Sequence, residues 1–185
     1  MDTNQATQPT SREEAFVNAL VSRIERDKGF AARLRRADNP DTEYQSWEFL
    51  AGFGIDLERD GERLPYALVA ATLAKAKKPK NGSLRLGQAI GLSYQDKGTK
   101  TAAADKADQA KARLRRILAC DDLPDLCRNL RPILTLIDSR VDKPLDYVRL
   151  LQQLRRFNFD QQKMKVKAQW AQEFYGHSHD DEEEA

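Results

Sequence analysis

The sequence is poor in the residues from which most enzyme sites are built. Its only two histidines, His177 and His179, stand between the last expected helix and an acidic C-terminal end. Nothing there would hold an imidazole rigidly, so we expect neither residue to act as an acid, a base or a metal ligand. The sequence also lacks the glycine motifs of nucleotide-binding loops and the nucleophile elbow of hydrolases. These absences argue against an enzyme and predict no metal site and no cofactor.

Long apolar runs and cysteines are scarce too. No run approaches the ~18 apolar residues that a transmembrane helix needs, and residues 1–10 lack the apolar core of a secretory signal. The two cysteines, Cys120 and Cys127, would lie roughly 10 Å apart along one helix, too far for a disulfide. We expect both to be small buried hydrophobic side chains, in a cytoplasmic protein with no membrane partner.

Charge is distributed unevenly along the chain. The formal net charge is only +2, but residues 180–184 contribute five negative charges. Residues 75–116 carry twelve lysines and arginines against three aspartates. A basic concentration of this kind is typical of a protein that binds a polyanion. The alternative is that these side chains only solvate exposed helix faces.

The hydrophobic pattern is helical throughout. Every strongly periodic segment repeats near 3.6 residues and none alternates as a half-buried strand would, which predicts an all-α fold, a bundle of about eight helices. Trp47 and Trp170 are expected to be core residues. The polar segment 96–104 interrupts the pattern and indicates two packed helical subdomains. The expected organisation is a disordered N-terminus (1–10), an N-terminal helical subdomain (11–95), a basic loop (96–104), a C-terminal helical subdomain (105–176) and a disordered acidic tail (177–185).

Two amphipathic segments indicate which side chains the helices leave on the surface. On a helical wheel of residues 145–157, the apolar side chains share one broad face, and the other face carries Arg149, Gln152, Gln153 and Arg156. In residues 111–118, three arginines project away from the apolar side: Arg113, Arg115 and Arg116.

Arginine in these positions favours phosphate binding, because a guanidinium can grip a phosphate through two hydrogen bonds and can also stack on a base. Surface ion pairs with Asp121, Asp122 and Asp125 are the alternative for some of them. The candidate nucleic-acid-binding residues are Arg35, Arg36, Arg63, Lys77, Lys78, Arg85, Arg113, Arg115, Arg116, Arg128, Arg131, Arg140, Lys143, Arg149 and Arg156.

An ordered set of short segments also resembles a known family. The segments are Leu34-Arg-Arg-Ala37, Trp47, Ser83-Leu-Arg-Leu-Gly-Gln-Ala89, Leu114-Arg-Arg-Ile-Leu118, Asp125-Leu-Cys-Arg-Asn-Leu-Arg131, Pro144-Leu-Asp-Tyr-Val-Arg-Leu-Leu151 and Trp170-x-x-x-Phe-Tyr175. Their order and spacing, over roughly residues 11–176, resemble the CasB family, the small subunit of the type I-E CRISPR surveillance complex called Cascade.

The resemblance implies an all-helical protein without catalytic activity that is present as two copies in Cascade. It implies three kinds of partner: the other Cascade subunits, the guide RNA, and the displaced, single-stranded non-target DNA, which a basic surface would hold. It also implies a role in stabilising the R-loop in antiviral defence. The family often carries a basic residue directly after a Leu-Gly pair; here Gln88 occupies that position and Arg85 comes earlier.

The sequence therefore predicts a non-catalytic Cascade small subunit that binds DNA or RNA through the phosphate backbone. Scattered arginines and lysines without a base-reading motif suit backbone binding, which is strong at low salt and indifferent to sequence. The alternative function is a helical protein–protein adaptor whose arginines pair with carboxylates and never contact nucleic acid.

Overall fold

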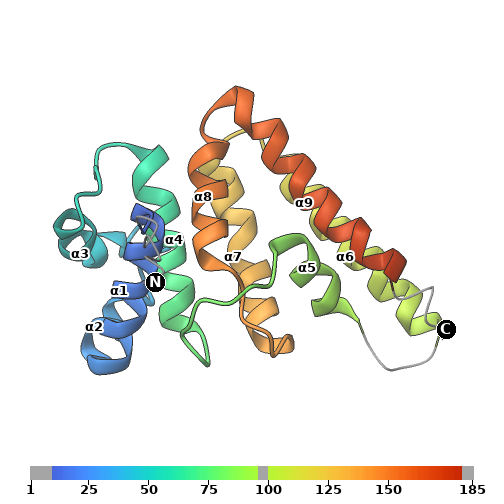
Figure 1. Ribbon diagram of the computed structural model, residues 1–185, viewed down its shortest axis with the longest axis horizontal. Coiled ribbons are helices and arrows are strands. Elements are labelled where there is room, and N and C mark those ends of the chain that lie inside the picture. Colours follow the sequence, from blue (N-terminus) through green and yellow to red (C-terminus); the bar gives the residue numbers. More distant parts are fainter. Residues whose placement is uncertain (1–9, 96–99, 181–185) are drawn as a thin grey trace, which may run out of the picture.

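The computed structural model describes residues 10–95 and 100–180. Within these residues there are nine α-helices, one short 3₁₀-helix and no β-sheet, so the predicted all-α fold is confirmed (Figure 1). None of these helices is long and apolar enough to span a membrane. The elements are α1 (Arg12–Arg26), α2 (Lys28–Leu34), η1 (Glu43–Ser46), α3 (Trp47–Gly52), α4 (Asp60–Lys75), α5 (Leu86–Tyr94), α6 (Lys100–Leu118), α7 (Leu123–Arg140), α8 (Tyr147–Phe157) and α9 (Asp160–Asp180).

Two helices extend into segments that we expected to be irregular. α6 already begins inside the expected loop 96–104, because three alanines, the strongest helix formers, follow its first two residues. α9 continues past Gly176 into the expected tail 177–185, so His177 and His179 lie in the helix. The rest of these two segments, and the expected disordered N-terminus up to residue 9, lie outside the described residues.

Side-chain caps begin several of the helices. Ser11 Oγ accepts a hydrogen bond of 3.1 Å from the Glu14 backbone N–H at the start of α1. Asp27, Asp122 and Asp146 do the same for α2, α7 and α8. Each cap satisfies a backbone donor that the first turn leaves free, and it favours the start of the helix at that residue.

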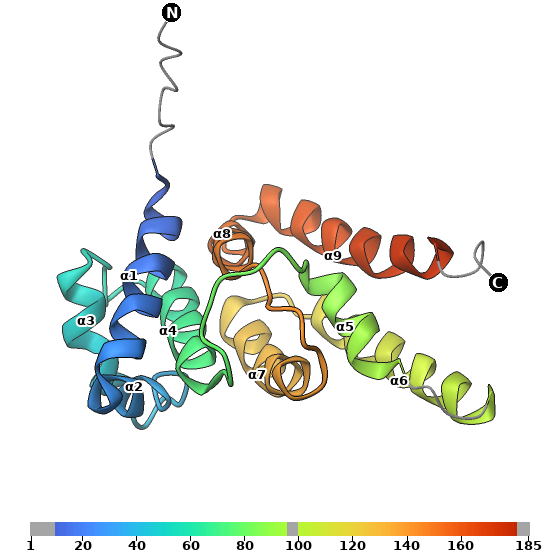
Figure 2. The ribbon, with the colours of Figure 1, turned by 60° about the horizontal axis from the view of Figure 1, so that its bottom comes forward.

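Helices α7 and α8 lie between two groups of helices. Figure 2 shows α1 to α4 on one side of this pair and α5, α6 and α9 on the other. α4 is buried along most of its length and packs against both α7 and α8. α5, which we expected in the N-terminal subdomain, packs against α6, α7 and α9. One hydrophobic core runs through both groups, and the division at residues 96–104 stays a prediction.

The two tryptophans have different environments. Trp170 is fully buried and stacks on Phe157, with 6.2 Å between the ring centroids, which confirms it as a core residue. Trp47 is 42% exposed, so the prediction that it belongs to the core was wrong. It opens the short helix α3, which covers the core with Leu50 and Phe49 instead.

Two linkers cross between the helix groups and hold each other in place. The Gly82 N–H donates to the Leu145 carbonyl at 2.9 Å, and the Asp146 N–H donates to the Leu84 carbonyl at 2.9 Å. A Cβ at Gly82 would lie 1.9 Å from the Pro144 carbonyl oxygen, so only glycine allows the linkers to approach this closely. The crossing brings the lysines that follow α4 (Lys77, Lys78 and Lys80) next to Lys143, which follows α7.

Candidate nucleic-acid interface

Arg63, one of the predicted binding residues, is tied into the fold. Its guanidinium donates to the Leu57 carbonyl and to Asp60 Oδ1, both at 2.6 Å, and its Nε forms an ion pair of 2.7 Å with Glu43 Oε1. Glu43 is buried, so loss of the guanidinium would leave its carboxylate without a counter-charge. We therefore place Arg63 outside the candidate interface.

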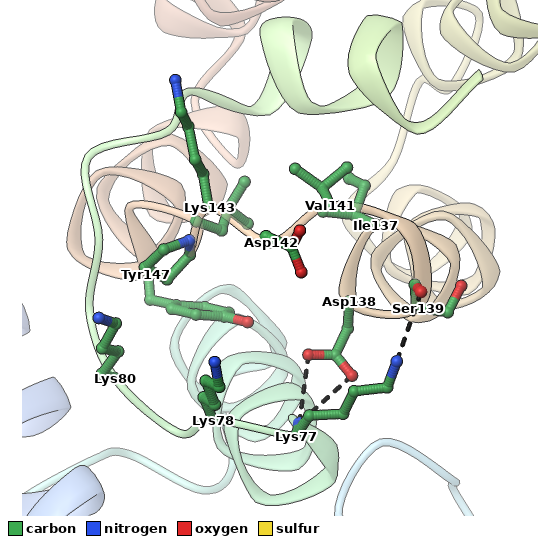
Figure 3. A pocket seen from close by; sticks show the side chains of 12 residues that line it. Lys77, Lys78, Lys80, Ile137, Asp138, Ser139, Val141, Asp142, Lys143 and Tyr147 are labelled. Atoms are coloured by element: carbon green, nitrogen blue, oxygen red, sulfur yellow. Dashed lines mark hydrogen bonds between the residues drawn. The ribbon is translucent and has the colours of Figure 1, made fainter. Parts of the chain in front are cut away.

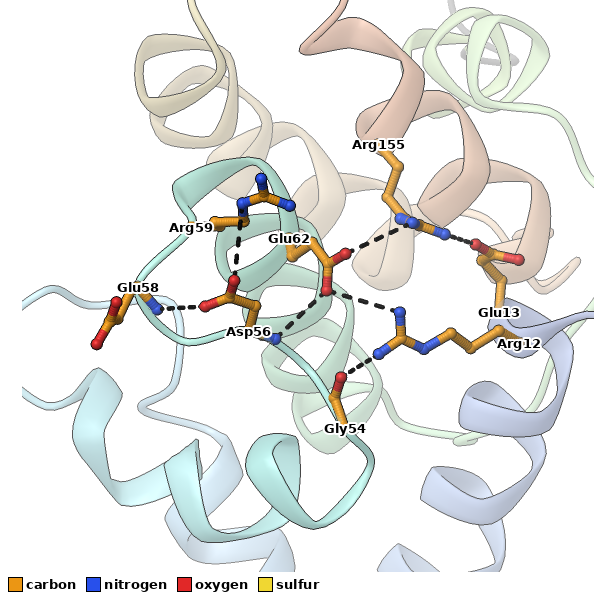
Figure 4. A network of polar contacts seen from close by, with 8 residues as sticks. All are labelled: Arg12, Glu13, Gly54, Asp56, Glu58, Arg59, Glu62 and Arg155. Atoms are coloured by element: carbon orange, nitrogen blue, oxygen red, sulfur yellow. Dashed lines mark hydrogen bonds and ion pairs between the residues drawn. The ribbon is translucent and has the colours of Figure 1, made fainter.

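Arg155 and Arg12 form a second network inside the fold (Figure 4). Arg155 on α8 donates to Glu13 on α1 and lies 3.9 Å from Glu62 on α4, while Arg12 lies 3.6 Å from the same Glu62. Burial alone would raise the pKa of Glu13, but hydrogen bonds from its own backbone and from Arg155 outweigh burial and lower that pKa. These two arginines hold three helices together, a role that sequence reasoning did not assign to either of them.

Six of the predicted residues, by contrast, gather on the surface where the C-terminal ends of α4 and α7 meet. We call this surface the basic edge. Lys80, which we did not single out from the sequence, belongs to it as well; its place in the basic segment 75–116 was the available signal. The residues of the basic edge are Arg35, Lys77, Lys78, Lys80, Arg113, Arg140 and Lys143.

The centre of the basic edge is a hollow of about 140 Å³ (Figure 3). Lys77 is anchored there, because its backbone N–H donates to the Asp138 carboxylate at 3.3 Å and its Nζ donates to the Ser139 carbonyl at 3.4 Å. Lys78, Lys80 and Lys143 also line the hollow. These three lysines are exposed and have no ion-pair partner among the described residues. The charged side chains that line the hollow are Lys77, Lys78, Lys80, Lys143, Asp138 and Asp142.

Arginines extend the basic edge in both directions. The Arg140 guanidinium lies over the Tyr94 ring, 5.8 Å from its centroid, and Arg113 Nε donates to the Tyr94 hydroxyl at 3.3 Å. At the opposite end, Arg35 Nε donates to a carbonyl in the last turn of α4 at 3.0 Å. The cations therefore follow a path from α2 across the ends of α4 and α7 to α6.

Other candidates lie outside this path. Arg115 and Arg116 are exposed on α6, as the helical wheel predicts, and neither has an ion-pair partner among the described residues. Arg128 pairs with Asp125 at 3.3 Å, which is the alternative that the sequence left open. Arg131 is partly buried, and its Nε faces no acceptor in the described part of the chain. The remaining exposed candidates are Arg36 and Arg156.

Arg85 and Arg149 line a second hollow, of about 410 Å³, between α5, α8 and α9. Arg149 donates to Glu173 Oε1 at 2.8 Å and its side chain is 36% exposed. Gln88 faces the same hollow as Arg85, so α5 brings both its arginine and the glutamine to one place.

The helical wheel misplaced one neighbour of Arg149. Gln153 was expected on the exposed face, but it is 3% exposed because α9 covers that side of α8. There it accepts a hydrogen bond of 2.8 Å from the Trp170 indole N–H. The wheel assigns a direction to each side chain, whereas the position of α9 decides whether that direction leads to water.

The basic edge has the chemistry of a surface that attracts a chain of negative charges. Most of its cations stand on helix ends and linkers, and Lys78, Lys80 and Lys143 form no ion pair within the described part of the chain, although Asp138 and Asp142 line the same hollow. Specific reading of bases needs paired donors and acceptors held in a fixed geometry, and the lysines of the central hollow offer donors only. Such a surface fits a phosphate backbone better than a particular base sequence.

The fold and this surface define an all-helical protein with a cationic edge built from helix ends and linkers. The family model of the CRISPR-associated protein Cse2 matches residues 31–175. The match covers most of the chain, so the protein belongs to the Cse2 family of CRISPR-associated proteins. This finding confirms the resemblance to CasB.

Solved structures agree with this assignment. CasB of M. ruber is 26% identical, with a TM-score of 0.74 over 95% of this chain and 99% of that chain. A Cse2-family protein from Thermus thermophilus is 24% identical, with a TM-score of 0.68 over 92% and 99%. A chain of a CRISPR RNA-guided surveillance complex is 22% identical, with a TM-score of 0.67 over 89% and 91%. No curated protein sequence matches.

Proposed function

We propose that this protein is the non-catalytic small subunit of a type I-E Cascade complex and that its basic edge holds the backbone of the displaced, single-stranded non-target DNA. The observation that carries the proposal is the gathering of Lys77, Lys78, Lys80 and Lys143 from two distant linkers on one surface. Family membership and the similar fold of a chain in an RNA-guided surveillance complex support it. In this proposal its partners are the other Cascade subunits, the guide RNA and a second copy of itself, and it acts in the cytoplasm in antiviral defence.

Binding to the phosphate backbone of the DNA suits this role for an energetic reason. The RNA–DNA hybrid that forms in an R-loop is about as stable as the DNA duplex that it replaces, so strand exchange is nearly balanced. A modest affinity for the freed strand is then enough to favour the open state. The protein has to bind the displaced strand of every target, whatever its sequence. Contacts to phosphates meet this need because they do not depend on sequence.

A salt titration with matched charge variants tests the proposal. Mixed-sequence single-stranded DNA should lose affinity log-linearly with salt, with a slope of about 0.7 per neutralised phosphate. Lys78→Ala with Lys143→Ala should lower that slope by about 1.4, because two contacts are lost. Lys28→Ala with Lys165→Ala removes the same charge from exposed sites on α2 and α9 and should leave the slope nearly unchanged.

Two results would contradict the proposal. Equal losses for both double variants would show that only the net charge matters. Absence of any DNA binding, together with unimpaired assembly of the variants into an RNA-containing complex, would favour the protein–protein adaptor instead. Co-purification of the tagged chain with guide RNA and further subunits tests the assembly itself.

A further inference from the structure

A chain of hydrogen bonds that starts in the core fixes the orientation of two amide side chains next to the hollow between α5, α8 and α9. The Trp170 indole N–H can only donate, and Trp170 is fully buried. It donates to Gln153 Oε1 at 2.8 Å, which turns the Gln153 amide nitrogen away from Trp170. That nitrogen donates to Gln169 Oε1 at 3.2 Å. The orientation of both amides therefore follows from the indole and needs no further assumption.

This hydrogen-bond chain determines which groups of Gln169 remain free at the hollow. Gln169 Oε1 accepts from Gln153 Nε2, which orients the Gln169 amide and leaves both of its Nε2–H donors for a ligand, and Gln169 lines the hollow. No acceptor among the described residues takes these protons. A glutamine that elsewhere on a surface turns freely is here held as a donor.

The one carboxylate that lines the hollow in the described part of the chain is already neutralised. Glu173 accepts from Arg149 Nη2 at 2.8 Å and from the Gly87 backbone N–H at 3.3 Å, and its side chain is 4% exposed. Arg149 keeps a buried Nε that faces no acceptor among residues 10–95 and 100–180. Arg85, at the N-cap of α5, is exposed and has no ion-pair partner in these ranges either.

Glycine brings these groups together. A Cβ at Gly87 would lie 2.3 Å from the Trp170 carbonyl oxygen, so the first turn of α5 lies directly against α9. This contact places Arg85 at the same hollow as Gln169 and Arg149. The hollow thus holds the donors of Arg85, Arg149 and Gln169 beside one carboxylate, that of Glu173, whose charge Arg149 balances, so the unbalanced positive charge is that of Arg85.

We infer that this hollow binds a phosphodiester group of single-stranded nucleic acid through Arg85, Arg149 and Gln169. A phosphodiester offers only acceptor oxygens, which match a set of hydrogen-bond donors. The basic edge close by favours a nucleic-acid strand over the carboxylate of a partner protein as the ligand. Lys80 and Lys143 of the basic edge precede the Leu84–Leu145 bridge in their linkers, and Arg85 and Arg149 follow it, so the two sites are only a few residues apart along each linker, a separation that one strand could span. The inference rests on the proposed function and adds to the basic edge a second, preorganised contact.

Gln169→Glu tests it with a minimal change of shape. The glutamate keeps an oxygen for the Gln153 amide but replaces the donor group by a negative oxygen. Affinity for mixed-sequence single-stranded DNA at about 0.1 M salt should fall roughly five- to tenfold, because a charge-assisted contact becomes repulsive. Gln161→Glu adds the same charge at an exposed site in the first turn of α9 and is the control. Thermal unfolding of both variants should match the parent protein.

Arg85→Ala gives an independent measurement, with Arg26→Ala at the exposed end of α1 as its control. Arg85→Ala should lower the salt slope by about 0.7, and the control should not. An abasic single strand keeps the phosphates and loses the bases, so Gln169→Glu and Arg85→Ala should be equally impaired on it.

Each other outcome overturns the inference. If the loss disappears on the abasic strand, the hollow contacts a base. If DNA affinity is kept while assembly into the RNA-containing complex fails, the hollow binds a partner protein. If Gln169→Glu behaves as Gln161→Glu while Lys78→Ala with Lys143→Ala still weakens binding, the proposed function stands and only this inference fails.

Discussion

Arg155 on α8 donates a hydrogen bond to Glu13 in the first turn of α1, although 142 residues separate them in the sequence. Both side chains are largely covered, and Arg155 also lies over the Tyr66 ring, 5.8 Å from its centroid. The pair fastens the N-terminal helix to the centre of the molecule. It also distinguishes Arg155 from its exposed neighbour Arg156, the one of the two that the sequence indicated as a binding residue.

This pair predicts how stability depends on pH. The pKa of Glu13 in the folded protein lies below its ordinary value of 4.5, so the unfolded chain binds the proton more tightly. The contribution of Glu13 to stability is therefore present above about pH 4.5 and is lost as the pH falls through the lower folded pKa. Glu13→Gln should reduce the free energy of unfolding at pH 7 by about 1–2 kcal/mol and flatten this acid dependence. Denaturant unfolding from pH 3 to pH 7 measures both effects.

Glu14→Gln is the matched control, because Glu14 is the exposed neighbour in the same helical turn and only its backbone makes a cap contact. Equal stability curves for the two variants would show that the contact with Arg155 does not stabilise the fold.

Gly87 should be intolerant of any side chain. Alanine there would place Cβ 2.3 Å from the Trp170 carbonyl oxygen and 2.7 Å from the Phe174 backbone nitrogen, so α5 would have to move away from α9. We expect Gly87→Ala to cost about 1–3 kcal/mol, the usual range for overpacking, measured by thermal or denaturant unfolding. Gly176→Ala meets nothing within 4 Å and should be neutral or slightly stabilising. Comparable stabilities of the two variants would disprove the close contact between these helices.

Arg115 and Arg116 should contribute to binding and not to folding. Both project from α6 into solvent, and no ion pair in the described residues depends on them. Replacing both by alanine should leave the melting temperature within about 2 °C of the parent, since such surface changes alter stability by about 0.5 kcal/mol or less. DNA or R-loop binding should weaken, because the sequence predicts that both arginines contact phosphates, here at a place outside the basic edge. A clear drop in melting temperature with full DNA affinity would reverse this assignment.

The two cysteines should be inert in the folded protein. Burial raises the pKa of Cys120 to about 11 and that of Cys127 to about 12, so at pH 8 only about one Cys120 thiol in a thousand is ionised. Both thiols are free and buried. A thiol reagent such as DTNB should react slowly with the native protein and rapidly, with two equivalents, after denaturation. Fast reaction in the native state would show that the turn between α6 and α7 opens readily.

The spacing of the two cysteines did not predict correctly where Cys120 lies. Their spacing suggests two turns of one helix, but Cys120 lies before the Asp122 cap that begins α7. Helix boundaries depend on caps whose effect is small compared with packing, so a shift of a few residues is common. The conclusion that both are buried, unpaired thiols nevertheless holds.

The sequence by itself determined the helical architecture, the burial of Trp170 and the excess of cations in residues 75–116. These properties depend on neighbours within one or two turns, whose spacing of 3.6 residues is visible in the chain. Only the tertiary structure decided which cations share a surface, that Arg63 and Arg155 serve the fold, and that Gln153 lies under α9. Those outcomes depend on which distant helix covers each exposed face, and packing of whole helices selects that partner without any local signal. The basic edge exists because the crossed linkers at Gly82 and Leu145 bring together lysines that are more than sixty residues apart.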